Sequence, residues 1–190
     1  MRRAGVKVAA RDRLLEAAER LFYTRGISAT GIDTITAEAG VAKMSLYNNF
    51  ASKDELVQSY LEQREQEWMR LYEDRVRHAE TPVQRVLAVF DAYLDHAETA
   101  YEHGFRGCGL LNAAAELPGD APGRRIVRKH KERVEALMRE HLQEVTSDGE
   151  VWAEHLSFLL EGAVSRAGLE ANPNRLLHAR QLASKLLGGV

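Results

Sequence analysis

The amino-acid sequence predicts an all-α protein, with a small helix-turn-helix domain followed by a larger helical domain. Apolar residues recur at helical spacing along most of the chain, and no stretch alternates polar and apolar residues as a β-strand would. Glycine, proline and N-capping residues separate the amphipathic segments. We therefore expect one domain over residues 1–52 and a second over residues 53–190.

Two short helices joined by a tight turn are predicted within residues 30–53, TGIDTITAEAGVAKMSLYNNFASK. The first runs from about Ile32 to Ala39, and its apolar face includes Ile35. Gly40 ends it, because glycine reaches the left-handed backbone conformation that lets the chain turn back within about three residues. The second helix begins at once. Such a pair is a helix-turn-helix, a motif that binds DNA.

The exposed face of the second helix carries side chains that suit a DNA groove. In this motif the second helix lies in the major groove and presents its early residues to base edges. Lys43 can donate to guanine or to a phosphate, while Asn48 and Asn49 carry the donor and acceptor pair that matches adenine. Tyr47 and Lys53, late in the helix and just after it, are placed for phosphate contacts. The residues predicted to bind DNA are Lys43, Met44, Ser45, Tyr47, Asn48, Asn49 and Lys53.

The charge of the chain is divided unequally between its two parts. The first 53 residues hold nine Lys or Arg and five acidic residues, a net of +4, which leaves 17 basic and 23 acidic residues, a net of −6, for the remainder. This division gives a polyanion one favoured docking surface. Arg2, Arg3 and Lys7 lie in an amino-terminal arm that is either a DNA contact beside the recognition helix or a solvated tail.

Six further helices are expected after residue 52. Ser52 is a predicted N-cap, and Glu55 completes a capping box with it. Proline in the first turn marks two later helix starts, at Pro82 and at Pro173. The expected helices span about Lys53 to Arg77, Pro82 to near Gly104, Leu110 to Leu117, Ala121 to Val145, Glu150 to Gly168, and Pro173 to Leu187.

Residues 11–64 resemble the amino-terminal domain of the tetracycline-repressor (TetR) family. Two departures, Met44 where many members have glycine and Asn49 where histidine often precedes the phenylalanine, lie on the exposed face and concern the operator rather than the fold. The resemblance adds Thr30 to the predicted DNA-binding residues. The matching elements are Leu21, Phe22, Gly26, Thr30, Ala39 to Val41, Leu46, Tyr47, Phe50, Ser52 and Lys53.

The resemblance also implies that the second domain binds a small effector in a space bounded by its helices. Ordinary hydrophobic core is the competing interpretation for each apolar residue there. Asn112 and His130 are of interest because a polar group that faces an apolar space needs a partner, which a ligand can supply. The predicted effector-binding residues are Trp68, Tyr72, Phe90, Tyr93, Leu111, Asn112, His130, Val134, Leu137, Met138 and Phe158.

The last two helices are predicted to form a dimer interface, because they carry more leucine than one subunit easily buries. Pairing two such helices with their symmetry mates makes a four-helix bundle, which is how the family dimerises. A two-fold dimer places two recognition helices about one DNA turn apart, so its target is a near-palindrome. The predicted interface residues are Leu156, Leu159, Leu160, Ala163, Leu176, Leu177, Leu182 and Leu186.

Other functions find little support in the residues. Cys108 follows Arg106, which can lower a thiol pKa, so redox sensing stands beside the interpretation of a small buried residue. The seven histidines do not cluster at metal-ligand spacing, and no phosphate-binding loop or nucleophile motif is present, so we expect no metal, no cofactor and no enzyme activity. The chain lacks the roughly 18 apolar residues of a membrane span, so we expect a cytoplasmic protein that does not contact membranes.

These observations predict a homodimeric transcriptional repressor that binds a palindromic operator and is released by a small, mostly apolar effector. The alternative is a small-molecule-binding module that keeps the helix-turn-helix as scaffold. A pure carrier has no need of Lys43, Tyr47, Lys53 or a positively charged amino-terminal third. Repression rather than activation follows from the resemblance alone, and the residues name neither the operator nor the effector.

Overall fold

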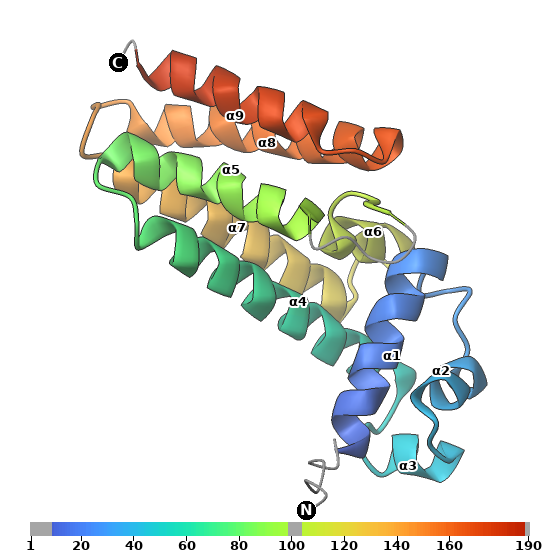
Figure 1. The fold of residues 1–190 in the computed structure, drawn as a ribbon. Helices are drawn as coiled ribbons and strands as arrows, with labels where there is room; N and C mark the ends of the chain where they lie inside the picture. The colour runs from blue at the N-terminus through green and yellow to red at the C-terminus, as the bar shows by residue number, and fades with distance from the viewer. Residues whose placement is uncertain (1–8, 99–103, 189–190) are drawn as a thin grey trace, which may run out of the picture.

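The computed structural model describes residues 9–98 and 104–188. The described residues are helical and contain no strand, which confirms the predicted all-α class (Figure 1). The helices are α1 (Ala10–Arg25), α2 (Ile32–Ala39), α3 (Lys43–Tyr47), α4 (Lys53–Val76), α5 (Pro82–Glu98), α6 (Gly109–Glu116), α7 (Pro122–Leu142), α8 (Gly149–Glu170) and α9 (Asn174–Leu187).

Helices α1 to α3 pack on one another and form the helix-turn-helix unit. Leu14, Ile35 and Leu46, one from each helix, have no exposed surface and make its core. The turn between α2 and α3 depends on Gly40, whose φ of 62° and ψ of 40° are left-handed. This left-handed conformation favours glycine, whereas the nearest atom to a Cβ there, a guanidinium nitrogen of Arg13 at 2.7 Å, is the end of a flexible side chain that can move.

Helix α4 begins at the predicted cap and joins the two parts of the molecule. The Ser52 Oγ accepts a hydrogen bond from the Glu55 N–H at 3.1 Å. The Glu55 carboxylate in turn accepts from the N–H of Ala51 at 2.7 Å, one residue earlier than in the usual capping box. Since α4 contacts α1 as well as α5, α6 and α7, it belongs to both domains.

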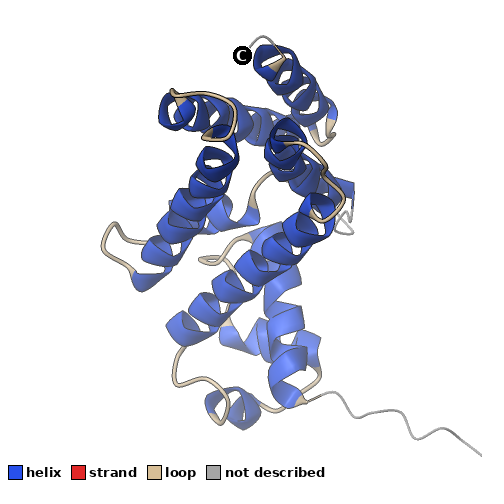
Figure 2. Cartoon of the chain, turned by 90° about the vertical axis from the view of Figure 1, so that its left-hand side faces the viewer, coloured by secondary structure: helices blue, strands red, loops and turns tan. Residues whose placement is uncertain are grey.

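The second domain packs α4, α5 and α7 against one another, and α8 and α9 lie across α5 and α7. Figures 1 and 2 place α8 and α9 at the end of the molecule away from α3. The short helix α6 lies beside the end of α1 and contacts α1, α4 and α7. Buried aromatic side chains, among them Trp68, Phe90 and Tyr93, fill the middle of this domain.

The described helix bounds agree with the sequence within a few residues. The stretch over which α5 was expected to continue toward Gly104, residues 99–103, lies outside the described residues, and α5 is described as far as Glu98. Part of the predicted amino-terminal arm, with Arg2, Arg3 and Lys7, lies outside the described residues. In the described ranges, no helix combines the length and the apolar character that crossing a membrane requires.

Candidate DNA-binding interface and effector region

Helix α3 presents a mixed polar and apolar face to solvent. Met44 is 69% exposed and Tyr47 is 48% exposed, and Lys43 and Asn48 are exposed beside them. The Leu46 side chain is completely buried against the rest of the unit, so the opposite face of α3 is turned toward solvent. The surface combines a cation, an amide and a phenol, which are the groups that bind phosphates and base edges.

Two residues of this face already have polar partners. The Lys43 ammonium lies 2.8 Å from a carboxylate oxygen of Asp33, and the hydrogen bond to Asp33 raises the pKa of Lys43. Both side chains are exposed, so water screens the pair and a phosphate can replace Asp33. Asn49 is half-buried and donates its Nδ2–H to the Ser45 carbonyl at 2.7 Å, which leaves its side-chain oxygen as an acceptor.

Thr30 and Lys53 have structural partners that the sequence did not indicate. The Thr30 side chain is completely buried and its Oγ1 donates to the Gly26 carbonyl at 2.7 Å. The predicted contact between this side chain and DNA is therefore wrong, since none of it reaches the surface. The Lys53 Nζ donates to the Ile27 carbonyl at 2.6 Å, so it braces the loop before α2 while remaining partly accessible.

A carboxylate of α6 holds the loop between α1 and α2. Glu116 accepts two backbone hydrogen bonds through its two oxygens, from the N–H of Ile27 at 3.0 Å and from the N–H of Ser28 at 2.8 Å. Partial burial opposes ionisation, but the hydrogen bonds from Ser28 and Ile27 outweigh it and lower the pKa of Glu116. Through Glu116, the second domain thus makes direct hydrogen bonds to the DNA-binding unit. Nothing in the sequence indicates that Glu116 pairs with Ile27 and Ser28.

A second connection between the domains is centred on Arg64 of α4. Its guanidinium donates to Glu19 of α1 at 2.5 Å and to Glu67, and its Nη2 lies 3.0 Å from Nδ1 of His96 on α5. Only 8% of the Arg64 side chain is exposed. Burial, together with the charge of Arg64, lowers the pKa of His96 to about 3, so this imidazole is neutral near pH 7.

Three of the predicted effector-binding rings surround Trp68 in the second domain. The ring centroids of Tyr72, Tyr93 and His130 lie 5.7, 5.3 and 5.2 Å from that of Trp68. Within the described part of the chain, the buried Trp68 Nε1 and His130 Nδ1 have no hydrogen-bond partner. Phe90, Val134 and Met138 are also buried, and Leu111 and Leu137 are half-buried.

Lys131 is a polar neighbour of this cluster that the sequence reading did not single out. Its Nζ donates to the Tyr93 hydroxyl at 2.9 Å and forms an ion pair with Glu161 at 2.7 Å. Burial opposes the charge of Lys131, but the neighbouring acidic groups raise its pKa well above the ordinary value. Lys131 lies in a segment rich in lysine and arginine, and this enrichment is the feature of the sequence that points to it.

Two predicted effector-binding residues lie elsewhere. Asn112 is exposed and donates its Nδ2–H to the Arg106 carbonyl at 2.9 Å, so it closes the loop before α6 and does not face an apolar space. Phe158 is 65% exposed on α8. It lines a groove of about 410 Å³ between α8 and α9, together with Leu159 and Leu182. Both residues therefore lie outside the Trp68 cluster, and their assignment to an effector site stays a prediction.

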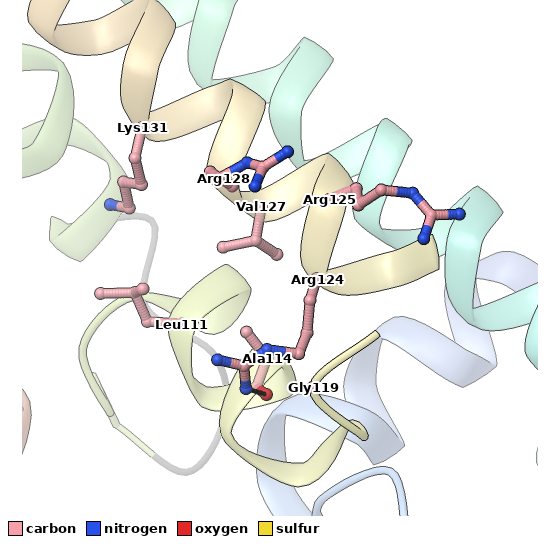
Figure 3. A pocket seen from close by; sticks show the side chains of 8 residues that line it. All are labelled: Leu111, Ala114, Gly119, Arg124, Arg125, Val127, Arg128 and Lys131. Carbon is pink, nitrogen blue, oxygen red and sulfur yellow. Dashed lines mark hydrogen bonds between the residues drawn. The ribbon is translucent and has the colours of Figure 1, made fainter. Parts of the chain in front are cut away.

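A pocket of about 440 Å³ opens beside α6 and the first half of α7 (Figure 3). One predicted residue, Leu111, lies in its wall. Four cationic side chains of α7 make up much of the rest of the wall. None of these four residues was predicted from the sequence to bind an effector. The complete lining is Leu111, Ala114, Gly119, Arg124, Arg125, Val127, Arg128 and Lys131.

The predicted dimer residues divide between two faces of α8 and α9. Leu177, Leu182 and Leu186 are 45%, 39% and 41% exposed, and Leu159 is half-buried. Leu156, Leu160 and Leu176 are packed inside the subunit, with exposed fractions of 1% or less, so their assignment to the interface is wrong. Ala163 is 8% exposed but lines the groove between α8 and α9, and its assignment to the interface stays a prediction.

The remaining candidate chemistry is limited. Cys108 is 7% exposed, as expected of a small buried residue, and its proposed redox role has no accessible thiol to support it. Among the described histidine, cysteine, aspartate and glutamate residues, no group of three or more is placed to hold a metal ion.

Comparison with known proteins matches both halves of the chain. Residues 14–60 match the family model of bacterial regulatory proteins of the tetR family, and residues 82–183 match that of the tetracyclin repressor-like C-terminal domain. A repressor, KstR2, of Mycolicibacterium smegmatis is 27% identical over 139 residues, 73% of this chain and 66% of the relative. KstR2 of Mycobacterium tuberculosis is 35% identical over 95 residues, 50% of this chain and 48% of the relative. The chain therefore spans about half to two thirds of these curated relatives.

Solved structures agree over nearly the whole length. A TetR-family transcriptional regulator from Streptomyces coelicolor is 33% identical, with a TM-score of 0.85 over 95% of this chain and 97% of its own. Regulatory protein TetR from Rhodobacter sphaeroides is 25% identical, with a TM-score of 0.77 over 93% of this chain and 97% of its own. With both domains matched in sequence and fold, the chain belongs to the TetR family of bacterial transcriptional regulators.

Proposed function

We propose that this protein is a homodimeric transcriptional repressor that binds a palindromic operator and releases it when a small effector occupies the second domain. The observation that carries the proposal is the exposed face of α3, where Lys43, Met44, Tyr47 and Asn48 stand outward on a helix anchored by Leu46. A ligand carrier has no use for such a face. The similarity to a relative named as a repressor supports a role in repression.

The direct test is selection of bound DNA from a random pool by the purified protein. Enrichment of a near-palindrome supports the regulator, because a two-fold dimer presents two copies of α3 about one helical turn apart. Absence of enrichment, with only weak and salt-sensitive binding, would favour the alternative of a small-molecule-binding module that keeps α1 to α3 as scaffold.

The apolar surface of α8 and α9 supports dimerisation. Phe158, Leu177, Leu182 and Leu186 are each more than a third exposed, and they gather on two neighbouring helices at the end of the molecule away from α3. Contact with the same surface of a second copy would remove these side chains from water and make a four-helix interface. Both recognition helices would then remain free to meet DNA.

Acidic substitutions on this surface should separate the subunits. We expect the double variant Phe158→Asp, Leu182→Asp to raise the dimer dissociation constant by about 100-fold or more, because each carboxylate would be buried without a partner. Sedimentation equilibrium over a range of protein concentrations measures the change. Met44→Asp places the same charge on an exposed apolar site of α3 and should leave the constant unaltered. A double variant that dimerises like the unmodified protein would contradict the assignment.

Effector binding can reach the DNA-binding unit through α6. This helix lines the pocket beside α7 through Leu111 and Ala114, and its last residue, Glu116, holds the N–H groups of Ile27 and Ser28. A ligand that binds more tightly to a shifted α6 must weaken operator binding by the same factor by which the operator weakens ligand binding. Arg64 and α4 supply a parallel connection.

Removing the charge of Glu116 should loosen this connection. A glutamine at position 116 keeps one acceptor oxygen but turns an N–H₂ group toward the other backbone N–H, so we expect about a tenfold loss of operator affinity for Glu116→Gln. Fluorescence anisotropy with labelled operator measures the affinity, and hydrogen exchange at Ile27 and Ser28 reports the loop. Glu62→Gln, at an exposed position of α4, is the matched control. Unchanged exchange at both amides would argue against the connection.

A further inference from the structure

The pocket beside α6 and α7 has an unusual electrostatic composition. Its wall contains three arginines and one lysine, and none of the acidic residues that the structure describes lines it. All four cations come from the first half of α7. Figure 3 shows Arg124 reaching toward Ala114 of α6 and Lys131 extending on the side of Leu111, whereas the guanidinium groups of Arg125 and Arg128 extend to the opposite side. Residues 122–133 hold six Lys or Arg and one acid, inside a part of the chain whose net charge is negative.

Two of these cations have only neutral acceptors in the described structure. The Arg124 Nη1 donates to the carbonyl of Ala114 at 2.7 Å, and the Arg125 Nη1 donates to the carbonyl of Asp120 at 2.8 Å. A carbonyl accepts a hydrogen bond without cancelling the positive charge. Each guanidinium has five N–H donors in a planar fork, so most of its donors remain available to a ligand.

The other two cations are only partly compensated. Arg128 lies 3.5 Å from Glu132 one helical turn away, and both side chains are about two thirds exposed, which makes a weak pair. Lys131 is paired with Glu161 and also donates to Tyr93. The pocket therefore holds more positive charge than its surroundings neutralise, and Lys131 connects it to the aromatic cluster around Trp68.

Operator phosphates are a poor match for this site. The pocket belongs to α6 and α7, and in Figure 1 α6 lies at one end of α1 while α3 lies at the other. DNA seated on α3 would meet the opposite end of that helix. The pocket is also concave and includes the apolar side chains of Leu111 and Val127, which suits a small molecule better than a nucleic-acid backbone.

We infer that this pocket binds the anionic group of the effector, a carboxylate or a phosphate, through Arg124, Arg125 and Arg128. The apolar part of the molecule then contacts Leu111 and Val127. Planar guanidinium groups are suited to carboxylate and phosphate because two N–H donors can meet two oxygens at once. This inference rests on the proposed effector response, and it replaces a mostly apolar effector with an amphipathic anion.

The same contacts supply a direct way for the ligand to act on α6. Arg124 ties α7 to α6 through the Ala114 carbonyl, two residues before Glu116. An anion that draws the Arg124 guanidinium into the pocket competes with this hydrogen bond. Loss of the bond releases α6 at the end that holds Ile27 and Ser28.

Isothermal titration calorimetry with three probes of equal chain length tests the inference: decanoate, decyl phosphate and decan-1-ol. We expect at least one anion to bind about tenfold or more tightly than the alcohol, because charge-assisted hydrogen bonds to arginine are lost with the uncharged head. The ratio between the two anions distinguishes carboxylate from phosphate. The double variant Arg125→Gln, Arg128→Gln should weaken anion binding about tenfold or more and leave the alcohol unaffected.

Lys129→Gln is the matched control, because it removes one positive charge from an exposed position of α7 that does not line the pocket. The inference is overturned if neither anion binds at millimolar concentration, if decan-1-ol binds as tightly as both anions, or if Lys129→Gln weakens binding as much as the double variant does. It is also overturned if the double variant lowers operator affinity but leaves anion binding unchanged, since the surface would then contact DNA.

Operator selection by the ligand-free protein tests the proposed function separately from anion binding. If the protein binds its selected operator but none of the anions, the regulator stands and the anionic effector fails. If anions bind through Arg125 and Arg128 but no operator is selected, the pocket assignment stands and the regulator fails.

Discussion

Replacing Lys43 and Tyr47 together with alanine is expected to weaken operator binding by about 100-fold or more. Each side chain is exposed on α3, and each can reach DNA without rearrangement of the core. Loss of one base-edge or phosphate contact costs about 1–3 kcal/mol, so the two losses together cost about 2–6 kcal/mol. A 100-fold weakening corresponds to about 2.7 kcal/mol, in the lower part of this range. Titration of the selected operator at fixed salt concentration measures the loss.

Salt dependence identifies which contacts were lost. Removal of a phosphate-binding lysine should lower the slope of log affinity against log salt concentration by about 1. Lys129→Ala removes a comparable charge from α7 and should change neither affinity nor slope. The folded state should be unaffected in all variants, because both α3 side chains are outside the core. Operator affinity within twofold of the unmodified protein would remove this face of α3 from the interface.

The substitution Arg64→Ala is expected to lower the free energy of unfolding by about 3–5 kcal/mol. Arg64 is a buried cation that Glu19 and Glu67 share, and its removal takes a positive charge from between two partly buried carboxylates. It also removes one polar partner of His96, whose ring is neutral near pH 7. Urea denaturation of the DNA-free protein, followed by circular dichroism, measures the change.

Arg70→Ala provides the matched comparison, because Arg70 is exposed on the same helix. Substitutions at such surface sites usually alter stability by about 0.5 kcal/mol or less. A loss below about 1 kcal/mol for Arg64→Ala would show that water reaches the site and compensates both carboxylates. Since Glu19 belongs to α1, the variant should also reduce operator affinity, even though Arg64 is far along α4 from the recognition helix.

The helical elements could be predicted closely because each is encoded locally. The αL turn at Gly40, the cap at Ser52 and the first-turn proline at Pro82 depend on residues within a few positions of one another. The family resemblance and the outward face of α3 follow from the same short stretch. These are features that periodicity and capping rules describe well.

Placement of α8 residues was harder, because this helix is apolar on two sides. Leu156 and Leu160 face the core while Phe158 faces solvent, and all three look alike in a list of hydrophobic residues. Periodicity separates apolar from polar faces, but it does not say which apolar face meets the subunit's own core and which is left for a partner. The sequence therefore led to an effector-binding role for Phe158, which is exposed, and to an interface role for Leu156, which is buried in the core.

The polar contacts between domains could not be predicted, because their partners are far apart in sequence. Glu116 lies 89 residues from Ile27, and Arg64 lies 45 residues from Glu19. In sequence, each of these charged residues resembles an ordinary solvated residue of a helix. Only packing of the helices shows that they are partly buried and that they are matched to particular backbone or side-chain groups.

The two hydrogen bonds of 3.0 and 2.8 Å that Glu116 accepts from the α1–α2 loop come from the main-chain N–H groups of Ile27 and Ser28. Every residue except proline offers the same donor, so these two bonds tolerate changes of loop sequence. Gly26, just before them, is less free to vary, because its φ is 88° and a Cβ there would lie 2.6 Å from the Glu116 carboxylate. Recombination that joins this second domain to the DNA-binding unit of another family member should therefore preserve communication between them, provided that a glycine stands at position 26 and neither donor position is proline. Operator preference and effector preference could then diverge independently.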